Sequence, residues 1–192
     1  SLDRHDKNTP VQSYEERITM IRAIRYVDEV VLYDTENDLL GLLEKINVFA
    51  YKIPSGEVTN IPLIEKIAKK GKPMIISTGM ATIADLDETV QTLRDANCEK
   101  FVLLKCTSTY PVSPENSNVL TIPHMRKLFN CEIGLSDHTT TNHACFGAVA
   151  LGASLLERHF TDHKNRTGPD IICSMDGKDL TDLIEGSKIL KL

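Results

Sequence analysis

The amino-acid sequence predicts an α/β fold built on a parallel β-sheet. Apolar strand-like runs recur from about residue 48 onward, and a helical pattern separates each run from the next. The runs are continuously apolar, which is typical of parallel strands that are buried on both faces. Such strands form either an open sheet or part of a barrel. Five are expected, over residues 49–53, 73–77, 101–106, 132–135 and 154–158.

Helical patterns fill the intervening segments, and the residues that flank them support this assignment. Thr82 stands three residues before Asp85, a spacing that caps the start of a helix. Gly71 suits the position just past a helix end, and Pro73 cannot continue a helix. Gly152 closes the fourth helix in the same way. The expected helices cover residues 61–70, 84–96, 122–129, 142–151 and 178–192.

The first 46 residues differ in character from the rest. A helix is expected over 14–26, a short strand over 27–32 and a Leu-rich helix over 36–46, so a short α-β-α segment precedes the regular series. No Gly-, Ser- or Pro-rich linker marks the change. The sequence therefore predicts two domains, 1–46 and 47–192, without a visible hinge between them.

Composition narrows the class of protein. At 192 residues, 41% hydrophobic and 26% charged, the chain is typical of a globular protein. The net charge of −5 and the lack of a basic run argue against nucleic-acid binding. No apolar run is long enough for a membrane span. The five cysteines are widely spaced and odd in number, which favours reduced thiols and a cytoplasmic location.

Two histidines, His138 and His159, follow the fourth and fifth predicted strands, where each runs into polar loop. Because the carboxyl ends of parallel strands converge on one face, we expect both imidazoles to lie there. Neutral imidazoles can bind a divalent metal and leave positions open for substrate oxygens. Ordinary hydrogen-bonded histidines remain the equal alternative from spacing alone.

Amino and hydroxyl groups at the same strand ends predict an anion site. Lys52 supplies a positive charge, and the turn after the second strand presents backbone N–H groups at a helix start. A carboxylate or a phosphate is the expected ligand. For each hydroxyl taken alone, helix capping is the competing interpretation. The hydroxyl donors expected around Lys52 are Ser55, Ser77, Thr78, Ser108 and Ser136.

Three further side chains lie in the same loops. Glu57 and Asp170 offer carboxylates for acid–base chemistry or for sugar hydroxyls, although loop carboxylates commonly cap helices. Tyr110 precedes Pro111 and can either present its ring and hydroxyl to a ligand or simply pack.

Six motifs, in order along the chain, resemble the sialic acid synthase family, which comprises N-acetylneuraminate synthase and its legionaminic and pseudaminic relatives. The resemblance covers the chain from about Val48 to its end. The motifs are Tyr-Lys-Ile-Pro-Ser-Gly-Glu-Val-Thr-Asn (51–60), Gly-Lys-Pro-Met-Ile-Ile-Ser-Thr-Gly-Met-Ala (71–81), Cys-Thr-Ser-Thr-Tyr-Pro (106–111), Gly-Leu-Ser-Asp-His-Thr (134–139), Glu-Arg-His-Phe-Thr-Asp (157–162) and Gly-Pro-Asp-Ile-Ile-Cys-Ser-Met (168–175).

The resemblance implies a partial (β/α)₈ TIM barrel, about the last five of its eight βα units. It implies the condensation of phosphoenolpyruvate with an N-acyl amino sugar such as N-acetylmannosamine, with release of phosphate. A Mn²⁺ or Mg²⁺ ion would activate the sugar aldehyde, with His138 and His159 as its protein ligands. By matching position, Glu57 and His159 lie at the reacting centre. The implied substrate-binding residues are Lys52, Ser55, Ser77, Ser108, Tyr110, Ser136 and Asp170.

The chain departs from the family pattern at both ends. The family's first barrel strands and its small C-terminal antifreeze-like domain have no counterpart here. Residues 1–46 resemble instead part of a glycerol-3-phosphate cytidylyltransferase-type nucleotidyltransferase, through residues 7–18 and 23–31. The nucleotide-binding HxGH-type motif is missing, so no catalytic role is expected for this segment.

These observations leave three candidate functions. The first is a sialic acid synthase-type transferase, and the second is an inactive fragment that keeps only a metal or anion site or the fold. The third, a nucleotidyltransferase, is tested by cytidine nucleotide binding. A five-stranded sector leaves strand edges unpaired, so we expect a homodimer, self-association through these edges, or a complementing partner.

Overall fold

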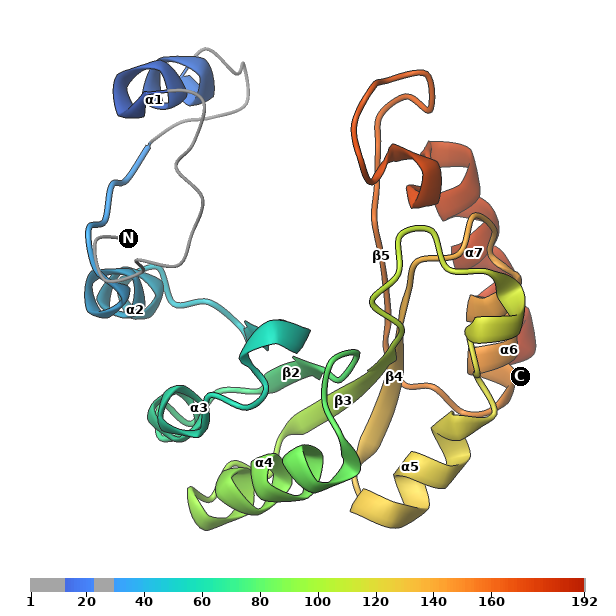
Figure 1. Ribbon diagram of the computed structural model, residues 1–192, viewed down its shortest axis with the longest axis horizontal. Helices are drawn as coiled ribbons and strands as arrows, with labels where there is room; N and C mark the ends of the chain where they lie inside the picture. The colour runs from blue at the N-terminus through green and yellow to red at the C-terminus, as the bar shows by residue number, and fades with distance from the viewer. Residues whose placement is uncertain (1–12, 23–29, 192) are drawn as a thin grey trace. The chain divides into compact units, whose positions relative to one another are not determined.

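The computed structural model describes residues 13–22 and 30–191, and its chain divides into two compact units, Ser1–Val48 and Phe49–Leu192 (Figure 1). None of the helices in the described part is both long and apolar enough to cross a lipid bilayer.

In residues 13–22 and 30–48, the described part of the first unit, the chain forms two helices, α1 (Tyr14–Arg22) and α2 (Glu36–Lys45). The first begins where the sequence predicts, and residues 23–26 of that prediction lie outside the described residues. Helix α2 is confirmed. The Thr35 side chain accepts a hydrogen bond from the Asp38 amide, and the Asp38 side chain in turn binds the Thr35 backbone. This reciprocal capping box satisfies amide groups that a helix start otherwise leaves unpaired.

The strand expected over 27–32 is wrong in its described part. Residues 27–29 lie outside the described residues, and Val30, Val31 and Leu32 belong to no strand. The side chains of Val31 and Leu32 are each 48% exposed. Strand propensity reflects packing on a half-buried sheet surface, and these residues lack that packing. The described part of this segment therefore holds two helices, without the strand of the expected α-β-α arrangement.

The second unit is built on a five-stranded parallel sheet whose strands follow one another in sequence order, which confirms the predicted fold class. Strand β1 begins at Tyr51, not at residue 49, since the Phe49 side chain is 87% exposed. Strand β4 continues to Asp137, beyond the predicted end at 135. The strands are β1 (Tyr51–Ile53), β2 (Met74–Ser77), β3 (Phe101–Cys106), β4 (Glu132–Asp137) and β5 (Leu156–Arg158).

Helices alternate with these strands and lie along the outside of the sheet (Figure 1). Thr82 and Asp85 form the expected capping box. Gly71 and Gly152 adopt φ angles of 71° and 89°, which L side chains rarely adopt, and so end their helices as expected. The helices are α3 (Ile61–Ala68), α4 (Ile83–Asp95), α5 (Thr121–Phe129), α6 (His143–Ala150) and α7 (Gly177–Leu190), with short 3₁₀ turns at Ser55–Glu57, Pro114–Asn116 and Ile171–Cys173.

The strand register separates two faces of the sheet. Paired residues in parallel strands point to the same side, and successive residues alternate. The outer face carries apolar side chains that are fully buried, among them Ile76, Leu103 and Ile133. The inner face ends in a polar row, in which Cys106 pairs with Ser136 and Ser136 with Glu157. The hydrophobic core therefore lies outside the sheet, and the polar chemistry lies inside it.

Candidate active site

The two predicted histidines lie together at the carboxyl ends of neighbouring strands. His138 directly follows β4 and His159 directly follows β5. Their ring centroids are 5.3 Å apart, with an angle of 62° between the planes. The Tyr110 ring lies beside both, 4.1 Å from His138 and 5.6 Å from His159. The loops after β3, β4 and β5 thus bring three aromatic rings into one cluster.

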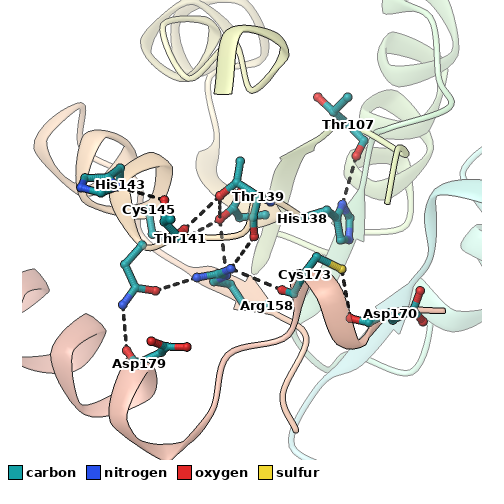
Figure 2. Close-up of polar contacts among 12 residues, drawn as sticks. Thr107, His138, Thr139, Thr141, His143, Cys145, Arg158, Asp170, Cys173 and Asp179 are labelled. Atoms are coloured by element: carbon teal, nitrogen blue, oxygen red, sulfur yellow. Dashed lines mark hydrogen bonds and ion pairs between the residues drawn. The ribbon is translucent and has the colours of Figure 1, made fainter. Parts of the chain in front are cut away.

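The hydrogen bonds of His138 define its tautomer. Its Nδ1 atom lies 3.0 Å from the Thr107 carbonyl oxygen (Figure 2). Because a carbonyl only accepts, Nδ1 carries the proton and the lone pair of the neutral ring is on Nε2. Burial alone would lower the pKa of His138, but hydrogen bonding with Cys106 and Thr107, together with the charge of Asp137, raises it.

Lys105, on the outer face, binds the side chain of the same Thr107 residue. Its Nζ atom donates to Thr107 Oγ1 at 2.6 Å and also to the Ser117 carbonyl. Thr107 Oγ1 in turn donates to the Asn116 carbonyl at 3.1 Å. Burial lowers the pKa of Lys105, and the nearby Cys106 and Asp137 oppose that change. Both ends of the loop 107–117 are thereby held in place beside His138.

A second cluster lies on the inner face near the histidines. Lys52 Nζ is 2.6 Å from Glu157 Oε2, and Ser136 Oγ donates to Glu157 Oε1 at 2.8 Å. Burial would raise the pKa of Glu157, but the bonds from Lys52 and Ser136 outweigh this effect and lower it. Glu157 therefore stays ionised and occupies the groups that sequence analysis assigns to an anionic substrate.

Three more of the predicted hydroxyls, those of Ser55, Ser77 and Ser108, lie near this cluster. The amide N–H of Gly79 donates to Ser55 Oγ at 3.0 Å. A Cβ atom at Gly79 would collide with Ser108 Oγ and would stand 2.9 Å from Cys106 Sγ, so a larger residue would force these side chains to move. Ser77 Oγ is buried and has no hydrogen-bond partner among the described residues. An unpartnered buried hydroxyl is costly unless a ligand or water satisfies it.

The two remaining predicted carboxylates, Asp170 and Glu57, make fewer contacts with these two clusters. Asp170 Oδ2 lies 3.8 Å from His159 Nδ1, and its side chain is 49% exposed. Glu57 lies in the 3₁₀ turn after β1, where its Oε2 accepts a hydrogen bond from Asn60 Nδ2 at 3.0 Å. The structure thus brings Asp170 to the edge of the histidine cluster and gives Glu57 a local partner.

Comparison with known proteins agrees with this geometry. Residues 33–192 match the NeuB family. The chain belongs to the NeuB family. It is 35% identical to the N-acetylneuraminate-9-phosphate synthase of Mus musculus over 188 residues, which cover 97% of this chain and 50% of the mouse protein. It is 39% identical to the N,N'-diacetyllegionaminic acid synthase of Campylobacter jejuni over 150 residues, or 77% of this chain and 44% of that protein.

A solved NeuB-type structure also superimposes on the fold. The N-acetylneuraminic acid synthetase of Leptospira borgpetersenii, crystallised with citrate, matches with a TM-score of 0.77 at 29% identity. The match covers 82% of this chain and 54% of that one. The five parallel strands thus form a half-barrel, as the resemblance implies. The chain spans about half the length of the curated relatives that it matches.

The family match extends into the segment expected to be cytidylyltransferase-like. It begins at Tyr33, and the mouse alignment covers nearly the whole chain. The cytidylyltransferase likeness of residues 1–46 stays a prediction. Residues 7–12 and 23–29, which carry most of that likeness, lie outside the described residues.

His138 and His159 alone would give a divalent metal only two protein ligands. Within residues 13–22 and 30–191, no group of three or more His, Cys, Asp or Glu side chains is placed to hold a metal ion. Two imidazoles do converge, however, and the Nδ1–H group of His138 donates to a backbone carbonyl, as the second ring nitrogen of metal-binding histidines usually does. An ion bound here would take its other ligands from water or substrate.

Sequence reasoning missed two residues of this cluster, Cys106 and Glu157. Burial would raise the pKa of the Cys106 thiol, yet hydrogen bonding with His138, Ser136 and Ser55 lowers it. The spacing of the cysteines does not predict that Cys106 lies in the site. The feature that could have predicted it is its position at the end of β3. Glu157 was visible as a polar strand tip two residues before His159, but its bond to Lys52 spans the sheet from β1 to β5.

Proposed function

We propose that this chain forms the catalytic half-barrel of a nonulosonic acid synthase. The proposed reaction joins phosphoenolpyruvate to an N-acyl amino sugar of the N-acetylmannosamine type and releases phosphate. The observation that carries the proposal is the adjacency of two polar clusters on the inner face, the His138–His159–Tyr110 rings and the Lys52–Ser136–Glu157 network. They match the two kinds of group that this reaction must hold, an aldehyde and an anion.

Phosphoenolpyruvate is assigned to the anion cluster. Lys52 offers a positive charge, and Ser55, Ser77, Ser108 and Ser136 offer hydroxyl donors. Ser77 supports this assignment because its buried Oγ has no partner among the described residues. Since Glu157 already binds Lys52 and Ser136, an incoming anion must share or displace these contacts.

The amino sugar is assigned to the histidine cluster. His138 and His159 would hold Mn²⁺ or Mg²⁺, which when bound supplies Lewis-acid polarisation of the aldehyde oxygen. The chain's own contribution is orientation, since the Thr107 carbonyl holds His138 in the tautomer whose Nε2 lone pair is available. Tyr110 and Asp170 are assigned to the sugar, and Glu57 to the reacting centre.

The proposed reaction forms one C–C bond and breaks one C–O bond. C3 of phosphoenolpyruvate attacks the aldehyde carbon to form the new C–C bond, and the aldehyde oxygen gains a proton. Water adds at C2, and the C2–O bond to phosphate breaks to release inorganic phosphate. Lys52 and the serine hydroxyls would stabilise the negative charge of the phosphate and carboxylate groups during these steps.

A second candidate function is a non-catalytic chain that keeps the anion or metal site, or only the fold. The observation in its favour is that the chain aligns with only about half the length of the curated relatives it matches. Phosphate release from phosphoenolpyruvate separates the two candidates, measured with Mn²⁺, a panel of N-acyl amino sugars and an EDTA control.

Sugar-dependent, EDTA-sensitive release that His138→Ala abolishes would support the synthase. The matched control is His124→Ala, which changes an exposed histidine of α5 and should leave release unchanged. Binding of phosphoenolpyruvate without release would support the second candidate. Equal loss in both histidine variants would contradict the assignment of His138.

A further inference from the structure

The register of β4 and β5 places the buried ion pair of Asp137 and Arg158 on the outer face of the sheet, opposite the two histidines. In the β4–β5 pair, Ser136 lies opposite Glu157 and Asp137 lies opposite Arg158. Since side chains alternate, the first pair points to the inner face and the second to the outer face. His138 follows Asp137 and His159 follows Arg158, so both histidines lie on the inner face again. Asp137 and Arg158 are thus the residues immediately before the two histidines.

Arg158 connects its own strand to two other segments of the chain, one at 139–142 and one at Cys173. Its Nη2 atom donates to the carbonyl of Thr139 at 2.6 Å and to that of Cys173 at 3.3 Å (Figure 2). Its Nη1 atom donates to Asn142 Oδ1 at 2.6 Å. Its side chain is 2% exposed, so these contacts face almost no competition from water.

Asp137 completes the arrangement from β4. Its Oδ1 accepts the Thr139 amide at 3.0 Å, and its Oδ2 accepts the Thr139 hydroxyl at 2.8 Å. Oδ2 also lies 3.4 Å from Arg158 Nε, and the Asp137 side chain is 1% exposed. The residues on both sides of His138 and the residue before His159 therefore belong to one buried network, which we call the Arg158 clamp (Asp137, Thr139, Asn142, Arg158 and Cys173).

We propose that Arg158 is the positioning residue for the histidine pair, acting through the Arg158 clamp. It holds the backbone at 137–139 so that His138 Nδ1 meets the Thr107 carbonyl, and it fixes the start of the 159–161 segment relative to that backbone. This inference rests on the proposed function in one respect, namely that the two histidines bind a divalent metal. The planar guanidinium is suited to this role because one side chain donates in several fixed directions.

The clamp also reaches the segment that follows the histidine loop. The amide of Met175 donates to the His159 carbonyl at 2.9 Å, and the amide of Thr161 donates to the Met175 carbonyl at 2.9 Å. Since Arg158 binds the carbonyl of Cys173, the same guanidinium anchors the backbone that borders His159 on its far side. Both histidines are held by contacts that lead back to Arg158.

The test compares Arg158→Met and Arg158→Lys with a matched control, Arg94→Met. Arg94 likewise donates through Nη2 to a backbone carbonyl, that of Phe129, at 2.6 Å. Phe129 ends α5 and precedes β4, so this bond lies at the opposite end of the strand from His138. Two quantities are measured in the 192-residue chain: affinity for Mn²⁺ alone, by electron paramagnetic resonance, and the ¹⁵N imidazole spectrum of His138 without metal, assigned with His138→Ala.

We expect Arg158→Met to weaken Mn²⁺ binding roughly tenfold or more and to mix the His138 tautomers. Arg158→Lys should restore part of both properties, and Arg94→Met should match the parent chain. If Arg158→Met equals Arg94→Met in both measurements, the positioning role is overturned. If Arg158→Met does not fold, Arg158→Lys decides, and parental affinity and spectrum in that variant overturn the role.

A failure of the proposed function has a different signature. If the parent chain binds no Mn²⁺, the metal assignment of the proposed function fails. The ¹⁵N spectrum still decides the positioning role in that case, because it needs no metal. An Nδ1-protonated His138 that persists in Arg158→Met would then overturn it.

Discussion

Lys52 of the first strand and Glu157 of the last form an ion pair, with Nζ and Oε2 2.6 Å apart. Strands β1 and β5 are the two ends of the five-stranded sheet. In a flat sheet, four spacings of about 4.8 Å would hold them about 19 Å apart. The contact therefore requires the sheet to curve around its inner face, as a sector of a barrel does.

Neutralising Glu157 should remove a stabilising contact in a pH-dependent way. The folded protein lowers the pKa of Glu157 from 4.5, so its contribution is present above that pH and is lost as the pH falls through the lowered value. Both side chains are more than a third exposed, so we expect Glu157→Gln to cost about 0.5 kcal/mol at pH 7. Urea denaturation at pH 7, 5 and 3 measures the difference, which should become smaller as the pH falls.

Glu65→Gln is the control for this experiment, because it removes an exposed pair with Lys69 within α3. A Glu157→Gln cost that grows as the pH falls would contradict the assigned role of the pair.

Gly79→Ala should disrupt the anion site. The added methyl group would push against the side chains of Ser108 and Cys106 and stand 3.2 Å from Ser55 Oγ. We expect phosphoenolpyruvate affinity, measured by calorimetry, to fall by about tenfold, equivalent to roughly 1.4 kcal/mol. Gly56→Ala is the matched control, since a Cβ there meets nothing within 4 Å. Equal affinities in the two variants would remove Ser55 and Ser108 from the binding site.

Leu103→Ala should destabilise the barrel sector strongly. Leu103 lies in the central strand β3 and is fully buried on the outer face. Its truncation leaves a cavity, for which we expect about 2–5 kcal/mol in the free energy of unfolding. The matched change Leu120→Ala, at a side chain 76% exposed, should stay within about 0.5 kcal/mol. Similar losses of unfolding free energy in the two variants would show that Leu103 does not belong to the hydrophobic core.

Self-association of the 192-residue chain is expected from its strand edges. In the described part of the chain, β1 and β5 each pair with one neighbouring strand, and only a single bridge between Phe160 and Met175 extends the pairing past β5. Exposed parallel edges bind other chains readily. Sedimentation velocity over a range of concentrations should show a dimer or larger species. A stable monomer at every concentration would refute this expectation.

Local features of the fold were predictable from the sequence because their causes are local. Continuous apolar runs predict buried parallel strands, and the Thr82–Asp85 spacing predicts a cap that the structure contains. The polar residues after each strand also predict that His138 and His159 lie at one end of the sheet. The strand expected over 27–32 failed in its described part, since composition alone does not supply a neighbouring strand.

What the sequence determined by itself is the order of strands and helices and the set of polar residues at the strand ends. Only the tertiary structure decided between an open sheet and a curved sector, and with it the pairing of Lys52 with Glu157. It also decided that Cys106 lies beside His138 and that Arg158 lies behind both histidines. The physical reason is that periodicity records which face a residue occupies, whereas curvature and register depend on contacts between segments far apart in the chain.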